Sequence, residues 1–289
     1  MEALAGFVKE SCRLMQTGIM RFELVTVPGT AERPNEDWAS LALPASGQGG
    51  SLVVLDGVTP PRGDDGCVHG VPWFTSRLGG ALLELSGSRR DMPLTEVLAL
   101  SIRRTADTHR DTCDLSHVRT PQATVVVVRW DAEAVEHLVL SDSTLLTESP
   151  DGLVRAVLDD RLDRIPREVL RSVSATDALR NQDGGFFTAA ADPGVAVHAV
   201  TGTTPRTEVR AVAALTDGAS RWTDLFEEGS WADLMALLRK EGPNGLVGRV
   251  RALESADALR GGAGRWKTHD DATVVYAELQ DPAAEGPRA

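Results

Sequence analysis

The sequence is poor in cysteine: its 289 residues include only Cys12, Cys67 and Cys113. Their number is odd and their spacings are wide, which is typical neither of a disulfide framework nor of a zinc knuckle. We therefore expect each cysteine to be buried as a small hydrophobic residue. The chain is also long enough to bury a sizeable hydrophobic core, which excludes a miniprotein held together by disulfide bonds.

Long apolar runs are also missing. No stretch of the sequence reaches the roughly 18 uncharged apolar residues of a membrane-spanning helix. The N-terminal segment carries Glu2, Lys9, Glu10 and Arg13 and lacks the apolar run of a secretory signal peptide. We therefore expect a cytoplasmic protein that does not bind membranes.

Positive charge is scarce, because 30 basic residues stand against 42 acidic ones and the net charge is −12. A protein that binds nucleic acid needs basic side chains to neutralise phosphates, so this charge argues against nucleic acid as a partner. The hydrophobic fraction of 42% and the charged fraction of 25% are those of an ordinary globular protein and exclude a disordered chain.

Strand and helix patterns follow one another without a break in composition, so we expect one domain over residues 1–280. A flexible tail rich in polar residues, Pro and Gly then occupies 281–289. Runs of β-branched residues bounded by turn residues predict strands over 22–27, 38–43, 51–55, 123–130, 135–141, 195–200, 210–216 and 272–279. Apolar residues at helical spacing predict helices over 72–85, 93–112, 230–239 and 246–258. The irregular order of these elements favours an α+β fold with antiparallel sheets.

Aspartates stand at the ends of several predicted strands. They are Asp37, Asp56, Asp142, Asp217 and the pair Asp270 and Asp271. A single Asp-Gly after a strand is usually a turn. Several carboxylates that converge at one edge of a sheet would instead repel one another unless cations neutralise them, and Mg²⁺ and Mn²⁺ prefer such oxygen ligands. From spacing alone, the turn and the metal site are about equally well supported.

Six segments, in this order, resemble the metal-dependent serine/threonine protein phosphatases of type 2C, and in particular their bacterial members. The segments are RPNED (33–37), VVLDG (53–57), PQATVVVV (121–128), LSDS (140–143), ALTDGAS (214–220) and HDDATVV (269–275). The resemblance implies a four-layer α-β-β-α sandwich, in which two antiparallel sheets pack face to face between helices. It also implies a site for two Mn²⁺ or Mg²⁺ ions at one edge of the sheets.

The resemblance implies a metal role for most of the strand-end residues. Asp56 bridges the two ions, the carbonyl of Gly57 reaches one of them, and Glu36 binds the second ion directly or through water. Asp217 and Asp270 complete the first ion's ligands. Asp142 matches the aspartate that helps to bind a third, looser ion in bacterial members.

The resemblance assigns catalytic roles to Arg33, which grips the substrate phosphate, and to Asp37, which holds the metal-bound waters nearby. Two cations about 3.5–4 Å apart share a water and lower its pKa, so that hydroxide attacks phosphorus in line with the leaving oxygen. The cations and a guanidinium neutralise the charge that builds on the phosphoryl oxygens.

The chain departs from the family pattern in the loop over residues 59–70. A second glycine does not follow Asp56-Gly57 at the usual spacing, and the histidine that many eukaryotic members carry there is replaced by Val58 or Thr59. His69 is the nearest alternative for a catalytic or substrate-binding histidine. Arg62 lies in the same loop and could replace Arg33 as the phosphate ligand.

A further departure is Ser141, which stands where the family usually has the glycine of Gly-Asp-Ser, so we expect a change in the local turn.

Three functions are consistent with the sequence. The first is a phosphatase that acts on phosphoserine or phosphothreonine in proteins. The second is the same hydrolysis of a small phosphorylated metabolite, suggested by the altered loop after Gly57. The third is a catalytically weak regulatory module with the same fold, since fold alone does not guarantee chemistry.

Overall fold

The computed structural model describes residues 21–44, 49–61, 63–259 and 268–279. It contains two five-stranded sheets in which all neighbouring strands are antiparallel. The first sheet has the order β1 (Arg21–Val27), β10 (Ala272–Glu278), β9 (Ala211–Leu215), β6 (Thr144–Glu148) and β7 (Val154–Val157). The second has the order β2 (Trp38–Ala42), β3 (Gly50–Leu55), β4 (Val125–Trp130), β5 (Ala134–Leu140) and β8 (Val200–Pro205).

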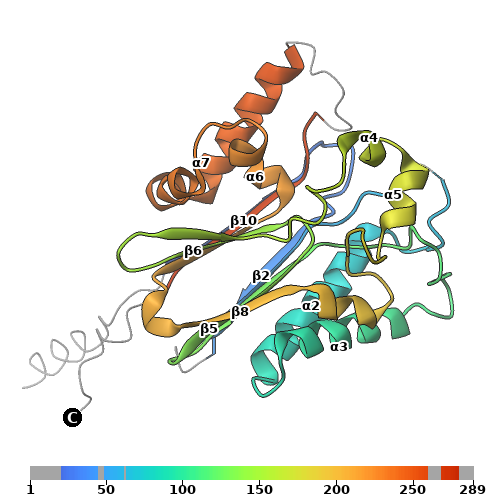
Figure 1. Ribbon diagram of the computed structural model, residues 1–289, viewed down its shortest axis with the longest axis horizontal. Helices are drawn as coiled ribbons and strands as arrows, with labels where there is room; N and C mark the ends of the chain where they lie inside the picture. The colour runs from blue at the N-terminus through green and yellow to red at the C-terminus, as the bar shows by residue number, and fades with distance from the viewer. Residues whose placement is uncertain (1–20, 45–48, 62, 260–267, 280–289) are drawn as a thin grey trace, which may run out of the picture.

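Helices cover the outer face of each sheet, so the molecule has four layers (Figure 1). Against the first sheet lie α6 (Asp217–Asp224) and α7 (Trp231–Leu259); against the second lie α2 (Val71–Ser88) and α3 (Leu94–Asp107). Short helices α4 (Arg167–Leu170), α5 (Val173–Leu179), η1 (Pro193–His198) and η2 (Arg206–Glu208) lie in the connections. The α+β sandwich predicted from the sequence is confirmed.

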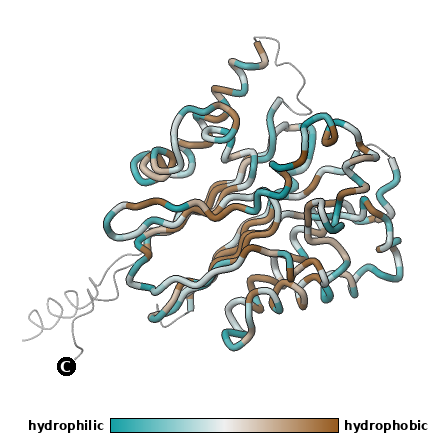
Figure 2. Tube along the Cα trace, in the orientation of Figure 1, coloured by the Kyte–Doolittle hydropathy of each residue, from teal (hydrophilic) through white to brown (hydrophobic). Residues whose placement is uncertain are grey.

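The apolar core is divided by the two sheets into three clusters. One lies between the second sheet and α2 and α3, another between the first sheet and α6 and α7, and the third between the sheets. Figure 2 shows the hydrophobic residues concentrated in the strands and on the helix faces that meet them. Strands β3 and β4 are buried along their whole length because both of their faces are covered, which explains their continuous apolar sequences.

The predicted strand over 195–200 is wrong. The chain forms the 3₁₀ helix η1 there and becomes extended only at Val200. Pro193 pre-sets the backbone for a turn, and the carboxylate of Asp192 accepts a hydrogen bond from the Gly194 N–H at 2.8 Å. These local features outweigh the β-branched valines that suggested a strand.

Several other elements do not appear in the sequence-based prediction: β6, β7, α4, α5 and α6. Strands β6 and β7 are short, and α6 begins at Asp217, directly after β9. Predicted helices 230–239 and 246–258 form α7, which is interrupted at Gly242 (φ 71°) as expected from this glycine. The predicted helix over 93–112 ends sooner, at Asp107.

The strand register places the ends that carry aspartates at the same edge. Trp38 pairs with Leu55, so Asp37 and Asp56 are adjacent across β2 and β3. Val274 pairs with Leu215 in the first sheet, which brings the start of β10 next to the end of β9. No helix in the described ranges is both long and apolar enough to cross a bilayer.

Candidate active site

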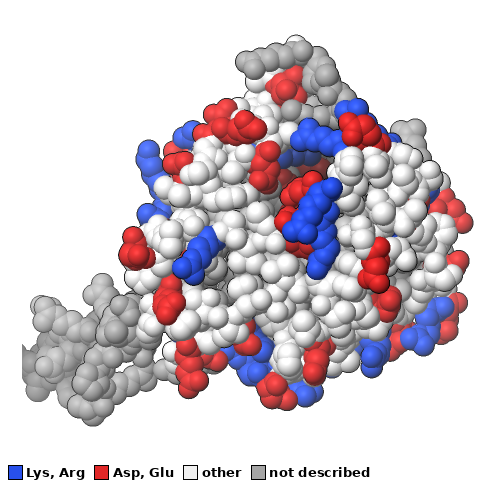
Figure 3. All heavy atoms as spheres, viewed as in Figure 1, with Lys and Arg blue, Asp and Glu red and all other residues white. Residues whose placement is uncertain are grey.

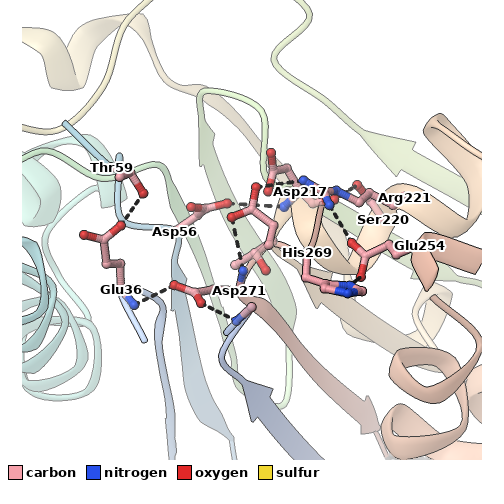
Figure 4. Close-up of polar contacts among 12 residues, drawn as sticks. Glu36, Asp56, Thr59, Asp217, Ser220, Arg221, Glu254, His269 and Asp271 are labelled. Carbon is pink, nitrogen blue, oxygen red and sulfur yellow. Dashed lines mark hydrogen bonds and ion pairs between the residues drawn. The ribbon is translucent and has the colours of Figure 1, made fainter. Parts of the chain in front are cut away.

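Asp56 lies at the centre of a group of carboxylates at this edge. Burial raises the pKa of Asp56 well above its ordinary value, and the negative charges of Asp217, Asp37, Asp142 and Asp270 raise it further. The backbone N–H of Asp217 donates a hydrogen bond to Oδ2 of Asp56 at 3.4 Å. The structure therefore brings together five aspartates that the sequence singled out, from strand ends in both sheets; Figure 4 shows two of them, Asp56 and Asp217.

Asp37 is nearly buried, with 9% of its surface exposed. Its Oδ2 accepts a hydrogen bond from the Thr216 hydroxyl at 2.9 Å, whereas its Oδ1 has no hydrogen-bond partner among the described residues. Burial and the nearby charges of Asp217 and Asp271 raise the pKa of Asp37 to about 8. A buried carboxylate oxygen without a donor, surrounded by further carboxylates, fits a site that holds cations and water.

Glu36 is held beside Asp56 by contacts from three directions. Its backbone N–H donates to Oδ2 of Asp271 at 2.7 Å, and its Oε2 accepts a hydrogen bond from the Thr59 hydroxyl. Gly57 packs so closely that a Cβ atom there would lie 2.5 Å from the Glu36 carbonyl oxygen. Only glycine allows this approach, so Gly57 has a packing role whether or not its carbonyl binds a metal ion.

Ser141 precedes Asp142 and adopts a left-handed backbone, with φ 68°. The Asp159 carboxylate stabilises this conformation by accepting the Ser141 N–H at 2.9 Å. Serine thus occupies a backbone conformation that favours glycine, and the turn forms although the family's usual glycine is missing. Burial and the charge of Asp217 raise the pKa of Asp142 to about 7.

Asp270 belongs to an ion-pair network that the sequence analysis missed. Its Oδ2 lies 2.8 Å from Nη2 of Arg221, whose Nη1 contacts Glu254 at 2.5 Å. His269 also contacts Glu254, at 2.8 Å from Nδ1 to Oε2 (Figure 4). One signal for Arg221 was present, because it follows Asp217 by four residues and so shares its face of α6. Glu254 comes from α7 and gave no such signal.

Asp271 was identified at its strand end but received no role. Its two carboxylate oxygens accept the backbone N–H groups of Gly29 and Glu36, each at 2.7 Å. It therefore fixes the loop that carries Glu36 against the start of β10. We infer a positioning role for Asp271 within the site.

A pocket of about 240 Å³ opens beside the carboxylates. Arg33 is an exposed residue that lines it, together with Glu36, Thr59, Asp270 and Asp271. On the face shown in Figure 3, acidic side chains lie in a hollow and basic side chains lie beside them. The positive charge of Arg33 beside these carboxylates suits the binding of an anionic substrate next to metal ions that the carboxylates would hold.

Two other residues were predicted to bind substrate. Arg62 lies outside the described residues, so its role stays a prediction. His69 stacks on Trp73 at 4.1 Å between ring centroids, and its Nδ1 lies 3.3 Å from the Cys113 sulfur. Its contacts are with thiols and aromatic rings, because the loop turns it toward the end of α3.

The expected burial of the cysteines as separate small hydrophobic residues is also wrong for two of them. Cys67 and Cys113 are half-buried, and their sulfurs lie 2.9 Å apart in contact with histidines. The loop over 59–70 folds onto the end of α3, which sequence spacing does not reveal. Cys12 lies outside the described residues.

Solved structures with similar folds are bacterial serine/threonine phosphatases. PstP/Ppp of Mycobacterium tuberculosis is 18% identical with a TM-score of 0.56, over 90% of this chain and 99% of that one. Stp1 of Staphylococcus aureus is 13% identical with a TM-score of 0.56, over 91% of this chain and 96% of that one. Another structure holds the catalytic domain of PstP with two manganese ions, at 17% identity, a TM-score of 0.55, and 91% and 99% coverage. At these identities the likeness establishes the fold.

A search of curated proteins gave no significant match. The family model described as protein phosphatase 2C matches residues 30–252, which include Arg33, Asp56, Asp142 and Asp217. This match covers most of the chain and starts just before the segment that carries Glu36 and Asp37. The chain belongs to the protein phosphatase 2C family.

Proposed function

We propose that Asp56 and its neighbouring carboxylates make this chain a working phosphatase for phosphoserine and phosphothreonine in proteins. Membership of the family makes it a metal-dependent phosphoric monoester hydrolase of the protein phosphatase class. The observation that carries the proposal is the convergence of five aspartates, where burial and then the charges of the other four raise the pKa of Asp56. Such a group is stable in its ionised form only when cations neutralise it.

Divalent cations are the implied cofactor, and the donor set fits them, because hard cations prefer carboxylate oxygens and retain several waters. We assign Asp56, Asp217 and Asp270 to one ion, and Asp56 with Glu36 and the Gly57 carbonyl to a second. Asp142 is the candidate ligand of a third, looser ion. All of these ions are proposed to be Mn²⁺ or Mg²⁺. When bound, such ions neutralise phosphoryl charge and lower the pKa of water.

Arg33 and Asp37 supply the remaining chemistry from this chain. Arg33, exposed beside the pocket, can bind two phosphate oxygens through its planar guanidinium and so orient the ester. Oδ1 of Asp37, which has no hydrogen-bond partner in the described part of the chain, can accept a hydrogen bond from the attacking water and hold it in place. Asp271 keeps Glu36 in position through the Glu36 N–H.

The alternatives are less well supported. A regulatory module without catalysis would have no need for five converging aspartates. A small phosphorylated metabolite as substrate is not favoured by the family. We also propose that residues 1–280 form one domain, since the family match and both sheets fall within that range.

The test is hydrolysis of p-nitrophenyl phosphate and of a phosphothreonine peptide with Mn²⁺, Mg²⁺ or EDTA. We expect turnover with a divalent ion, none with EDTA, and a loss of at least about 100-fold in Asp56→Asn and Asp217→Asn. Asp233→Asn, an exposed acidic residue outside the site, serves as the matched control. Metal-independent turnover, or full activity in Asp56→Asn, would refute the proposal. A strong preference for small esters over the peptide would favour the metabolite phosphatase.

A further inference from the structure

Four metal-ligating side chains gather outside the acidic site: Cys67, His69, His109 and Cys113. One ligand atom from each lies within 4.8 Å of all the others. Cys67 and His69 come from the loop before α2, whereas His109 and Cys113 come from the turns after α3. We propose that these four residues bind one Zn²⁺ ion in a closed, structural site.

The sulfur–nitrogen distances fit a tetrahedral ion. With Zn–S near 2.3 Å and Zn–N near 2.0–2.1 Å, a tetrahedron places sulfur and nitrogen about 3.5–3.6 Å apart. The three measured S–N separations are 3.6 Å (Cys67 to His69), 3.5 Å (Cys67 to His109) and 3.3 Å (His69 to Cys113). All three involve Nδ1, so both imidazoles present the same nitrogen to the sulfurs.

The two sulfurs are 2.9 Å apart, which is longer than the roughly 2.05 Å of a disulfide bond. A tetrahedral zinc site needs about 3.8 Å between them, so the sulfurs must separate by somewhat less than 1 Å when the ion enters. Each thiol loses its proton to solvent as its bond to zinc forms. The two thiolates then balance the charge of the ion, and no further ligand is required.

The surroundings hold the four side chains in place. The Cys113 N–H donates to the His109 carbonyl at 3.0 Å, and this helical spacing of four residues puts both side chains on one face. The Asp114 N–H donates to the Gly66 carbonyl at 2.7 Å, which joins the loop to this turn. The Cys67 N–H donates to Asp65 Oδ1 at 3.0 Å, and this turn directs Cys67 toward the cluster.

His109 is 3% exposed, and its Nε2 has no hydrogen-bond partner in the described part of the chain. The polar contact of its ring is therefore made through Nδ1, with the Cys67 sulfur at 3.5 Å. Trp73 lies against both imidazoles, with centroid distances of 4.1 Å to His69 and 5.0 Å to His109. Two thiols and two imidazoles, one of them buried and both against an aromatic wall, are a ligand set that suits zinc.

The ion would close the loop that follows β3 and Asp56. At one end of this loop the Val58 N–H donates to the Gln122 carbonyl at 2.9 Å, and Thr59 contacts Glu36. At the other end, zinc would join Cys67 and His69 to the end of α3. The loop that departs from the family pattern is thereby fixed at both ends.

The first test measures zinc in the purified full-length chain by mass spectrometry after dialysis against metal-free buffer. We expect one zinc per chain in the wild type, in Asp56→Asn and in Cys12→Ser, and none in the double variant Cys67→Ser/Cys113→Ser. Asp56→Asn removes a central residue of the acidic site, so zinc that this variant retains is bound outside the acidic site. Equal zinc in the double variant, or none in the wild type, would overturn the proposal.

The second test does not require a stable variant. Wild-type chain loaded with Co²⁺ should show the visible absorption bands of a tetrahedral ion with thiolate ligands, and Zn²⁺ should abolish them. Removing the metal should lower the thermal midpoint by roughly 5–10 °C. Absence of these tetrahedral thiolate bands, or a Cys67–Cys113 disulfide found in peptides from chain purified without air, would refute the zinc site; octahedral cobalt bands alone would report ions at the carboxylates. None of these readouts depends on phosphatase activity.

Discussion

Arg221 forms ion pairs with Asp270 and Glu254 and thereby joins the acidic site to α7. The side chain of Glu254 is fully buried, and it also contacts Arg251 at 2.7 Å and His269 at 2.8 Å. Arg221 therefore holds a proposed metal ligand and a buried carboxylate at the same time. It also offsets part of the negative charge that Asp217 and Asp270 place at this edge.

Replacing Arg221 with alanine should destabilise the chain. Removing one partner of a buried ion pair leaves the other charge poorly compensated, at a cost of about 3–5 kcal/mol when the charge has no other partner. Glu254 keeps Arg251 and His269, so we expect a loss of roughly 1–3 kcal/mol in the free energy of unfolding, measured with urea. Arg249→Ala breaks an exposed pair with Glu241 and should have no measurable effect. Equal stability of the two variants would contradict this account.

The stability of the metal-free chain should fall as pH rises. In the folded chain the pKa of Asp37 is about 8 and that of Asp142 is about 7, whereas the ordinary value is 3.8. Both carboxyls therefore bind protons more tightly in the folded than in the unfolded chain. This contribution to stability is complete below pH 3.8 and is lost as pH rises through 7 and 8. The thermal midpoint in EDTA should therefore decrease between about pH 5 and 8.5.

Two comparisons check the origin of this pH dependence. Asp37→Asn removes one titrating group and should flatten the slope. Saturating Mn²⁺ should reverse it, because the ion binds deprotonated carboxylates and binds more tightly as pH rises. A midpoint that rises with pH in EDTA would show that these carboxylates are ionised without metal.

Ser141→Gly should stabilise the chain by up to about 1 kcal/mol, because glycine adopts the left-handed conformation without the cost that serine bears. The gain is limited by the greater freedom of glycine in the unfolded chain. Ser141→Ala keeps the unfavourable conformation and loses the hydroxyl contact with Asp142. We expect alanine to be less stable than serine, and glycine more stable, in thermal unfolding. The opposite order would refute the interpretation of this turn.

Arg33→Ala should raise KM for a phosphopeptide by about 10–100-fold, since a charge-assisted contact to phosphate contributes about 1.5–3 kcal/mol. The affinity for Mn²⁺ should change little, because Arg33 lines the pocket and carries no ligand atom for the ion. Steady-state kinetics and calorimetric metal titration separate the two effects. Arg89→Ala, which affects an exposed arginine paired with Asp91, is the control. An unchanged KM would show that a residue other than Arg33 contacts the phosphate.

The residue pattern along the chain predicted an α+β fold with antiparallel sheets and placed the aspartates at strand ends, whereas the four layers and the metal site were expected from the resemblance to the phosphatase family. A continuous apolar strand such as β3 must be covered on both faces, and Asp56 directly follows it. Antiparallel pairing then brings Asp37 beside Asp56, since Trp38 is opposite Leu55. The same reasoning failed for η1, where Pro193 and the Asp192 turn outweighed the apolar pattern.

Only the tertiary structure decided which distant side chains meet. Cys67 and Cys113 are 46 residues apart, and Arg221 and Asp270 are 49 apart, with no periodicity to connect them. Such contacts depend on how loops fold back onto helix ends, which is set by packing and by isolated hydrogen bonds such as Asp114 to Gly66. Strand ends are fixed by a repeating pattern along the chain, whereas these pairs are fixed by the path of the chain in space.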